Sequence, residues 1–357
     1  MSKPVKVAAA HPPLWHEISY KIEDEAAVLK LVDGHIERIL ELADEAADAG
    51  AIAVAYPEDT LGLLGWQSAH LDSQGSLLAT AVERLLAAVS AKAKERSIYI
   101  IVCNDMPAGD VISNTAVLIG KDGNEIGRYR KVNQPFAERW KANGTSYPVF
   151  ETEDLGTVGL TICYDMVFPE ATRALALNGA DIVFDLSMGG ASMGRGKEAG
   201  RAAFITRAAD NGLWVVAVWR GRSWFISPDG EIVSATKNKE ALTYGEIDLG
   251  SQAHANLVER RARIFAERMP ETYGILTDPN PPLLQKLKAD ELPPPEVYWR
   301  SSAKALTIGV ERVDEVGQLA EAGKTEEARK GYEALIEEFR TSWVENVSRQ
   351  RLEELGK

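Results

Sequence analysis

Cys163 is the residue of this chain best placed to act as a nucleophile. It follows an apolar run that ends at Ile162, and polar residues and Pro169 lead from it into a predicted helix. A thiol at such a junction lies near unpaired helix N–H groups, which favour a thiolate and any oxyanion beside it. Core packing is the alternative, since cysteine is often buried. The chain contains two cysteines, so neither a disulfide framework nor a multi-thiolate metal site is predicted.

Three charged side chains upstream of this cysteine could supply the other groups that thiol chemistry needs. A nucleophilic thiol requires a base for its proton and a donor for the oxyanion. Glu58 follows the apolar run 52–56. Lys131 ends the run 126–130, and Glu138 lies in the loop after it. Each alone is more often a solvated or capping charge. Together they predict that a carboxylate, an ammonium and a thiol meet at one edge of a sheet.

The elements that must position these residues alternate between strands and helices over the first 250 residues, which is typical of a layered α/β protein. Strands are predicted at 5–10, 52–56, 98–103, 115–119, 125–131, 158–162, 181–186, 213–219 and 244–247. Helices are predicted at 24–49, 76–96, 169–178 and 201–211. Asp-Gly pairs at 122–123 and 229–230 predict hairpins, so a purely parallel sheet is not favoured. Cys103, inside an apolar strand, is predicted to belong to the core.

Composition limits the classes of function. With 357 residues and 45% hydrophobic content, the chain can bury a large core. A formal charge of −13 argues against nucleic acid or an anionic membrane as the main partner. No stretch approaches the roughly 20 apolar residues of a membrane span, and the N-terminus lacks a signal-peptide pattern. With two cysteines, these features predict a cytoplasmic protein.

The character of the sequence changes after about residue 250. We predict a catalytic domain at 1–250, a proline-rich connecting segment at 251–300 and a helical C-terminal extension at 301–357. In the extension, Thr325 begins a helix whose apolar residues recur at helical spacing. The unit 319–328 resembles the turn of a tetratricopeptide hairpin, although a plain pair of C-terminal helices is the simpler interpretation.

The motifs around the three catalytic candidates resemble those of the nitrilase superfamily of carbon–nitrogen hydrolases, whose Glu-Lys-Cys triad occurs in this chain order. The matching segments are Tyr56-Pro57-Glu58, Tyr129-Arg130-Lys131-Val132 and Ile162-Cys163-Tyr164-Asp165. Further similarity extends the resemblance over roughly residues 4 to 250. It implies an α/β fold, a four-layer αββα sandwich, here with a helical C-terminal extension.

The resemblance also implies roles for the candidate residues. Glu58 would be the general base, and Cys163 would form a thioester. Lys131 and the backbone N–H of Tyr164 would stabilise the oxyanion, while Glu138 would orient the lysine or the substrate. No metal or organic cofactor is implied, and a homodimer or higher homo-oligomer is expected.

The implied substrate is a small amide or N-carbamoyl compound, because Cys-Tyr-Asp is frequent in those branches of the superfamily. A nitrilase is the alternative within the superfamily, and an inactive member serving as an interaction protein is the alternative outside catalysis. Tyr164 and Met188 are candidate substrate-binding residues. The chain departs from the family in a glycine- and methionine-rich loop after Leu186 and in an apparently shortened loop at 219–224.

Overall fold

The protein is built around two six-stranded sheets. The computed structural model describes residues 4–10, 18–70, 75–135, 138, 140–188, 198–237, 241–279, 281–283, 308–340 and 342–356. The first sheet has the order β12 (Leu242–Ile247), β1 (Val5–Ala10), β2 (Ala53–Ala55), β3 (Tyr99–Ala108), β4 (Val111–Ile119) and β5 (Glu125–Arg130). The second has the order β11 (Ile232–Ala235), β10 (Arg222–Ile226), β9 (Trp214–Trp219), β8 (Ile182–Ser187), β7 (Thr157–Ile162) and β6 (Val149–Glu151).

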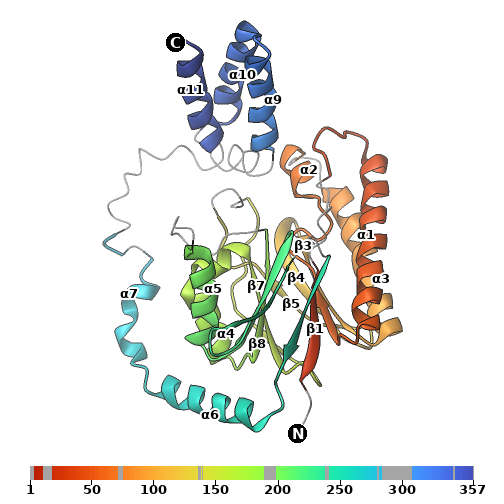
Figure 1. The fold of residues 1–357 in the computed structure, drawn as a ribbon, viewed down its shortest axis with the longest axis vertical. Helices are drawn as coiled ribbons and strands as arrows, with labels where there is room; N and C mark the ends of the chain where they lie inside the picture. Colours follow the sequence, from red (N-terminus) through yellow and green to blue (C-terminus); the bar gives the residue numbers. More distant parts are fainter. Residues whose placement is uncertain are drawn as a thin grey trace.

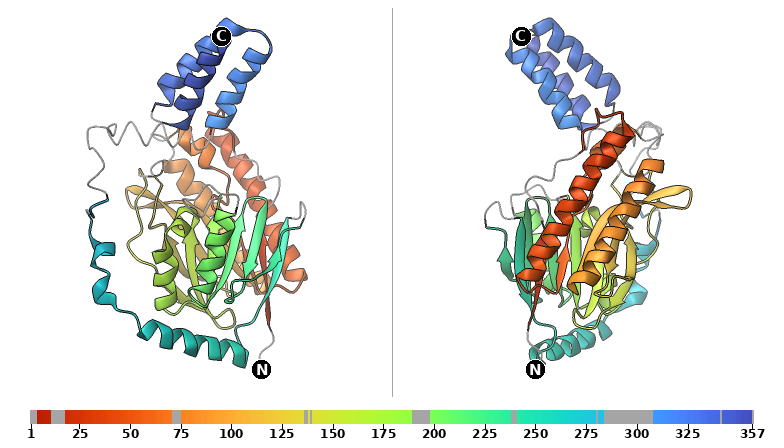
Figure 2. Two further views of the ribbon diagram at one scale, coloured as in Figure 1. Left: turned by 60° about the vertical axis from the view of Figure 1, so that its left-hand side comes forward. Right: turned by 90° about the vertical axis from the view of Figure 1, so that its right-hand side faces the viewer.

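Helices cover the outer face of each sheet (Figures 1 and 2). Helices α1 (Glu25–Asp48) and α3 (Gly75–Arg96) pack on the first sheet, and α4 (Pro169–Leu177) and α5 (Ala199–Ala209) pack on the second. Alternation along β1 shows the layering, because Ala8 and Ala10 face the helices whereas Val7 and Ala9 face the other sheet. The predicted αββα sandwich is confirmed.

Parallel pairing places the ends of several strands at one edge. Strands β1, β2 and β3 pair in parallel in the first sheet, as do β7, β8 and β9 in the second. Their carboxyl ends carry the segments that follow them in sequence. The remaining pairs are antiparallel, as the predicted hairpins require; Gly123 and Gly230 have φ values of +84° and +81° in the turns.

Strands β3 and β4 are longer than the sequence predicts. They extend to Ala108 and begin at Val111, and Gly109 turns between them with φ of +68°. Their added residues include Asn104 and Asn114, which are buried polar side chains. Because an apolar pattern locates strands by hydrophobicity, it misses extensions that bury polar groups for a site.

The predicted loop at 219–224 is a tight hairpin. Trp219 pairs with Arg222 at the start of the antiparallel β9–β10 ladder, and Gly221 in the turn has φ of +78°. Positive φ costs glycine little, so a two-residue turn suffices here. The glycine- and methionine-rich loop predicted after Leu186 lies largely outside the described residues, at 189–197.

The C-terminal part contains more helix than predicted. Helix α6 (Gln252–Ala266), η3 (Pro270–Thr272) and α7 (Gly274–Thr277) occupy much of the segment predicted as a connector. Arg261 anchors α6 by donating to the carbonyl of Ala180 at 2.8 Å. None of the helices in the described ranges is both long and apolar enough to cross a membrane.

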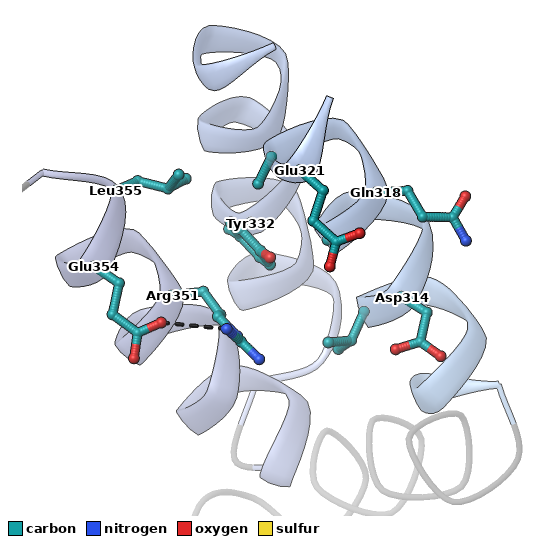
Figure 3. A pocket seen from close by; sticks show the side chains of 10 residues that line it. Asp314, Gln318, Glu321, Tyr332, Arg351, Glu354 and Leu355 are labelled. Carbon is teal, nitrogen blue, oxygen red and sulfur yellow. Dashed lines mark hydrogen bonds and ion pairs between the residues drawn. The ribbon is translucent and has the colours of Figure 1, made fainter. Parts of the chain in front are cut away.

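Within residues 308–340 and 342–356, three helices form the C-terminal unit, one more than the predicted pair. They are α9 (Gly309–Glu321), α10 (Thr325–Glu338) and α11 (Trp343–Leu355). Tyr20 packs against their shared core, and Lys21 pairs with Glu311 and Glu315 at 2.9 and 2.6 Å. The helices also line a pocket of about 410 Å³ (Figure 3). The domain boundaries remain a prediction.

Candidate active site

Cys163 stands at a sharp junction between strand and helix. It is the first residue of the short 3₁₀ helix η2 (Cys163–Val167), directly after β7, and its φ is 47°. A left-handed backbone is uncommon in residues other than glycine. It persists where the surrounding structure holds it, and such positions cluster at functional sites. The junction therefore displays the thiol at the carboxyl edge of the second sheet.

The carboxylate of Asp165 holds this junction in place. It accepts hydrogen bonds from the Ile162 N–H at 3.0 Å and the Tyr129 hydroxyl at 2.6 Å. Its other oxygen accepts from the Asn133 N–H at 2.8 Å. Tyr129 and Asn133 flank Lys131, so one carboxylate fixes the turn of the thiol relative to the segment of the lysine. Asp165 belongs to the cysteine motif, but its anchoring role follows only from the structure.

Glu58 lies in a turn just beyond β2. The next residue, Asp59, has φ of 55°. Thr60 ties the turn to β3, since its N–H donates to the Cys103 carbonyl at 2.7 Å and its hydroxyl accepts from the Cys103 N–H at 3.0 Å. These bonds fix the point at which the glutamate leaves the sheet.

The Glu58 carboxylate is 3% exposed and is held by three donors. Lys131 Nζ lies 2.9 Å from Oε1, and the Asn114 amide donates to the same oxygen at 2.7 Å. The Met188 N–H donates to Oε2 at 3.2 Å. This last bond crosses from the end of β8 to the end of β2 and joins the two sheets at the site.

Lys131 connects the two predicted glutamates. Its fully buried ammonium lies 2.9 Å from Glu58 Oε1, and 2.9 and 3.1 Å from the two oxygens of Glu138. Burial by itself would lower the pKa of Lys131, but the charges of Glu138 and Glu58 outweigh it and raise the pKa well above its ordinary value. Lys131 is therefore a fixed cation across the physiological pH range.

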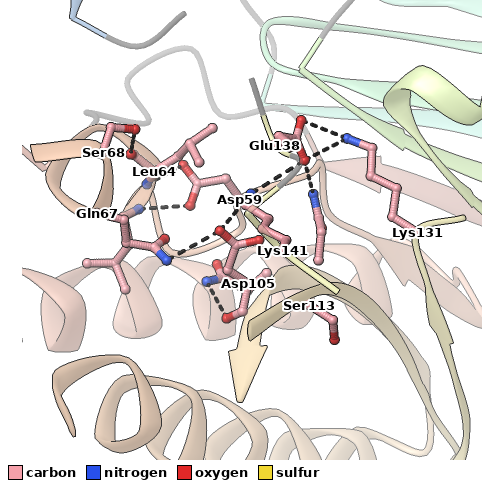
Figure 4. A network of polar contacts seen from close by, with 12 residues as sticks. Asp59, Leu64, Gln67, Ser68, Asp105, Ser113, Lys131, Glu138 and Lys141 are labelled. Carbon is pink, nitrogen blue, oxygen red and sulfur yellow. Dashed lines mark hydrogen bonds and ion pairs between the residues drawn. The ribbon is translucent and has the colours of Figure 1, made fainter. Parts of the chain in front are cut away.

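The cluster continues beyond the predicted residues through a second lysine (Figure 4). Lys141 Nζ lies 3.4 Å from Glu138 Oε2 and 2.8 Å from Asp105 Oδ2. Burial would raise the pKa of Glu138, but Lys131 and Lys141 lower it to about 2. Glu138 is thus ionised at neutral pH. Neither Lys141 nor Asp105 is among the residues that the sequence analysis selected.

The pKa of the Cys163 thiol is raised, which favours the protonated form rather than the thiolate expected at the start of a helix. Burial first, and the charge of Glu58 second, raise the pKa of the thiol above its usual range, while Lys131 opposes them. Nucleophilic attack therefore requires a base that removes the proton as the bond to carbon forms. Glu58 is a carboxylate whose charge acts directly on the thiol, so the arrangement can supply that base.

Cys103 is buried, as predicted, but it contacts the site. Its thiol donates to Asn114 Oδ1 at 3.3 Å, and the amide of Asn114 in turn reaches Glu58 and, at 3.5 Å, Glu138. Asn114 thus bridges Glu58 and Glu138 through its amide nitrogen. Sequence reasoning missed it, since a lone asparagine beside apolar residues carries no signal of its own.

The two candidate substrate-binding residues lie at the same edge. Tyr164 follows the thiol in η2, and its ring meets Phe168 edge-on at 5.4 Å between centroids. Met188 is partly buried and contributes its N–H to Glu58. Their contacts with substrate remain predictions. Over the described ranges, the structure contains no group of three or more His, Cys, Asp or Glu side chains arranged to hold a metal ion.

A buried carboxyl on β8 predicts a pH-dependent stability. Burial raises the pKa of Asp185 to about 8, although the Ser187 and Thr161 hydroxyls donate to it at 2.7 and 3.0 Å. Because the pKa is raised in the folded state, Asp185 disfavours folding increasingly from about pH 4 to pH 8. Asp185→Asn should therefore raise the free energy of unfolding by about 2–4 kcal/mol at pH 8 and by much less at pH 5.

Urea denaturation of both proteins at the two pH values measures this difference. Asp185→Asn keeps the size of the side chain, and its amide can bond to the same hydroxyls. If the wild type and Asp185→Asn differ in unfolding free energy by the same amount at pH 5 and at pH 8, the pKa of Asp185 is not raised in the folded protein.

Comparisons with known proteins agree with this architecture. A model of the carbon–nitrogen hydrolase family matches residues 25–255. A deaminated glutathione amidase of Synechocystis is 30% identical over 260 residues, which span 65% of this chain and 93% of that protein. A nitrilase of Pyrococcus abyssi is 33% identical over 199 residues, covering 51% and 71%. A crystal structure of a carbon–nitrogen hydrolase from Helicobacter pylori, 21% identical, aligns with a TM-score of 0.62 over 76% of this chain and 97% of that one.

Proposed function

This chain belongs to the carbon–nitrogen hydrolase family, the nitrilase superfamily, and from that premise we propose that it hydrolyses a small amide or N-carbamoyl compound through a thioester on Cys163. The observation that carries the proposal is the buried contact of Lys131 with both Glu58 and Glu138 beside the thiol of Cys163. Such a cluster combines a base, a fixed cation and a nucleophile at one strand edge.

In the first half of the reaction, the thiol of Cys163 attacks the carbonyl carbon of the substrate. Its proton passes to Glu58 as the carbon–sulfur bond forms, and the carbonyl oxygen becomes an oxyanion. Collapse of this intermediate breaks the carbon–nitrogen bond. The proton held by Glu58 goes to the departing nitrogen, so ammonia leaves and a thioester remains.

In the second half, water attacks the thioester carbon. Glu58 takes a proton from the water, the carbon–sulfur bond breaks, and that proton returns to the sulfur of Cys163. The net reaction consumes one water and yields an acid and ammonia. The same carboxylate serves both halves because it returns to its ionised form after each.

The oxyanion needs donors that are in place before charge develops. Lys131 supplies a permanent cation for this purpose, and the Tyr164 N–H supplies a backbone donor next to the nucleophile. Glu138 is ionised and grips Lys131 through two oxygens, so it fixes the direction of the ammonium. The lysine thus keeps its place when Glu58 becomes neutral.

A substrate panel tests the proposed reaction. Ammonia release would be measured with aliphatic amides, ω-amides, N-carbamoyl compounds and nitriles, with Cys163→Ala protein as the blank. We expect turnover of amides or N-carbamoyl compounds and a covalent adduct on Cys163 in mass spectra of rapidly quenched protein. Turnover of nitriles alone would instead assign a nitrilase, in line with the Pyrococcus relative. No release from any compound would favour an inactive interaction protein.

A further inference from the structure

Arg220 lies at the same sheet edge as the candidate nucleophile. It occupies the tight turn between β9 and β10, directly after the carboxyl end of β9. Strand β9 adjoins β8, which Met188 follows, and β8 adjoins β7, which Cys163 follows. Two strand spacings correspond to about 10 Å, so Arg220 stands to one side of the reacting centre rather than on it.

The guanidinium of Arg220 reaches across to the other sheet. Its Nη2 lies 2.6 Å from Asp59 Oδ2, and Asp59 follows Glu58 in the chain. The carboxylate of Asp59 also accepts from the N–H groups of Leu63 and Leu64 at 2.8 and 3.1 Å. Asp59 is therefore well supplied with donors, and it holds the arginine at the edge that carries the general base.

Within the described residues, one donor of Arg220 has no acceptor. Its Nε is buried and has no hydrogen-bond acceptor in the part of the chain that the structure describes. Lys131 and Lys141 are enclosed by carboxylates, with side chains no more than 1% exposed, whereas the side chain of Arg220 keeps 21% exposure. Of these three cations, Arg220 has the most exposed side chain, and its guanidinium is the one that carboxylates do not enclose.

We propose that Arg220 recognises a carboxylate at the end of the substrate distant from the scissile amide. A guanidinium presents planar N–H groups that match a carboxylate, and a buried N–H without an acceptor favours a ligand that supplies one. The lateral offset from Cys163 separates the recognised group from the reacting carbon. The substrate class is then an ω-amide of a carboxylic acid, a choice that rests on the proposed amide hydrolysis.

The competing role for Arg220 is purely structural. Its ion pair with Asp59 joins the two sheets and could serve only to hold them together. A structural role does not distinguish charged from neutral substrates. It therefore predicts that Arg220→Gln and Asp59→Asn have the same effect on the preference for the acidic amide. Recognition predicts that the two partners differ, since only Arg220 contacts the ligand.

The test compares matched amides that differ in one terminal group. Succinamate, glutaramate and adipamate carry a carboxylate, and butyramide, valeramide and hexanamide carry a methyl group in its place. The quantity compared is the ratio of kcat/KM for the best acidic amide to kcat/KM for the matched neutral amide. Arg220→Gln should lower this ratio by about 10–100-fold, mainly through the KM of the acidic amide, as expected for loss of one charge-assisted contact. Arg220→Lys should restore part of the preference.

Asp59→Asn is the matched control, because it removes the charge of the partner while its amide oxygen can still accept from the guanidinium and keep Arg220 at the edge. We expect it to retain the wild-type preference for the acid, whatever its overall rate. If Arg220→Gln and Asp59→Asn alter the acid-to-neutral ratio equally, or if neither alters it, Arg220 is only a clamp and the proposal is wrong.

A binding measurement separates this proposal from the proposed reaction. Calorimetry with succinate, glutarate and adipate, the products of the acidic amides, needs no turnover. Binding to the wild type that weakens about 10-fold or more in Arg220→Gln supports the recognition site even if no amide is hydrolysed. Absence of binding by all three dicarboxylates, together with no preference for acidic amides, would overturn it.

Discussion

Replacing Cys163 with alanine is expected to reduce ammonia release by at least about 10⁴-fold, because the proposed acyl intermediate forms on its sulfur. The alanine removes the attacking sulfur and little else, since the positive φ of residue 163 is held by Asp165. Steady-state ammonia release on the best substrate of the panel measures the loss. The thermal midpoint of unfolding should stay near that of the wild type, which separates a catalytic effect from a folding defect.

The second cysteine provides the control for this result. Cys103→Ala removes a buried thiol that contacts Asn114, so it should cost stability but reduce turnover by no more than about tenfold. In the wild type, iodoacetamide should label Cys163, which is partly exposed, before Cys103, which is fully buried. Normal turnover by Cys163→Ala would refute the nucleophile.

The predictable part of the site is the part that follows apolar strands. Glu58 and Cys163 follow the apolar strands β2 and β7, one from each sheet, whereas Lys131 follows the mixed strand β5 and contacts Glu58. Hydrophobic periodicity locates such strands, and topology then brings their ends together. Lys131 and Glu58 are 73 positions apart in the chain, and the fold brings them into contact.

The unpredicted part consists of buried polar residues inside or beside strands. Asn114 lies within β4 and Asp105 within β3. In a sequence pattern, a polar residue at such a position indicates that the strand has ended. Lys141 lies in a loop, where the sequence indicates an exposed charge, although the residue is only 4% exposed. Each is stable inside the protein only because its partner comes from another segment, as Asp105 does for Lys141. Single-sequence patterns do not contain those pairings.

Arg220 shows the same limit in a different form. A loop that looked shortened is a two-residue hairpin turn, and the turn aims an arginine at the opposite sheet. Its partner, Asp59, lies 161 positions away. Local sequence therefore gave no reason to connect the two residues, and the specificity proposed for this edge depends wholly on the tertiary fold.

Replacing Lys131 with methionine should have the second large effect, on both activity and stability. The variant leaves Glu58 and Glu138 buried beside each other without the cation that contacts both. Removing one partner of a buried ionic cluster typically costs about 3–5 kcal/mol. We therefore expect a drop of that size in the free energy of unfolding at pH 7, measured by urea denaturation. Residual protein that is still folded should release ammonia at least about 10²-fold more slowly, because a principal oxyanion donor is lost.

Lys121→Met is the matched control, since Lys121 pairs with Asp154 at the exposed β4–β5 turn and should contribute only about 0–1 kcal/mol.

The pH dependence of the unfolding free energy gives a second check. In the wild type, the lowered pKa of Glu138 stabilises the fold above about pH 4.5, and this contribution is lost as pH falls toward about 2. In Lys131→Met, Glu138 loses one of its two cations, so the difference in unfolding free energy between the two proteins should shrink at low pH. A difference that does not change between about pH 5 and pH 3 would contradict the assignment of the ionised Glu138–Lys131 pair.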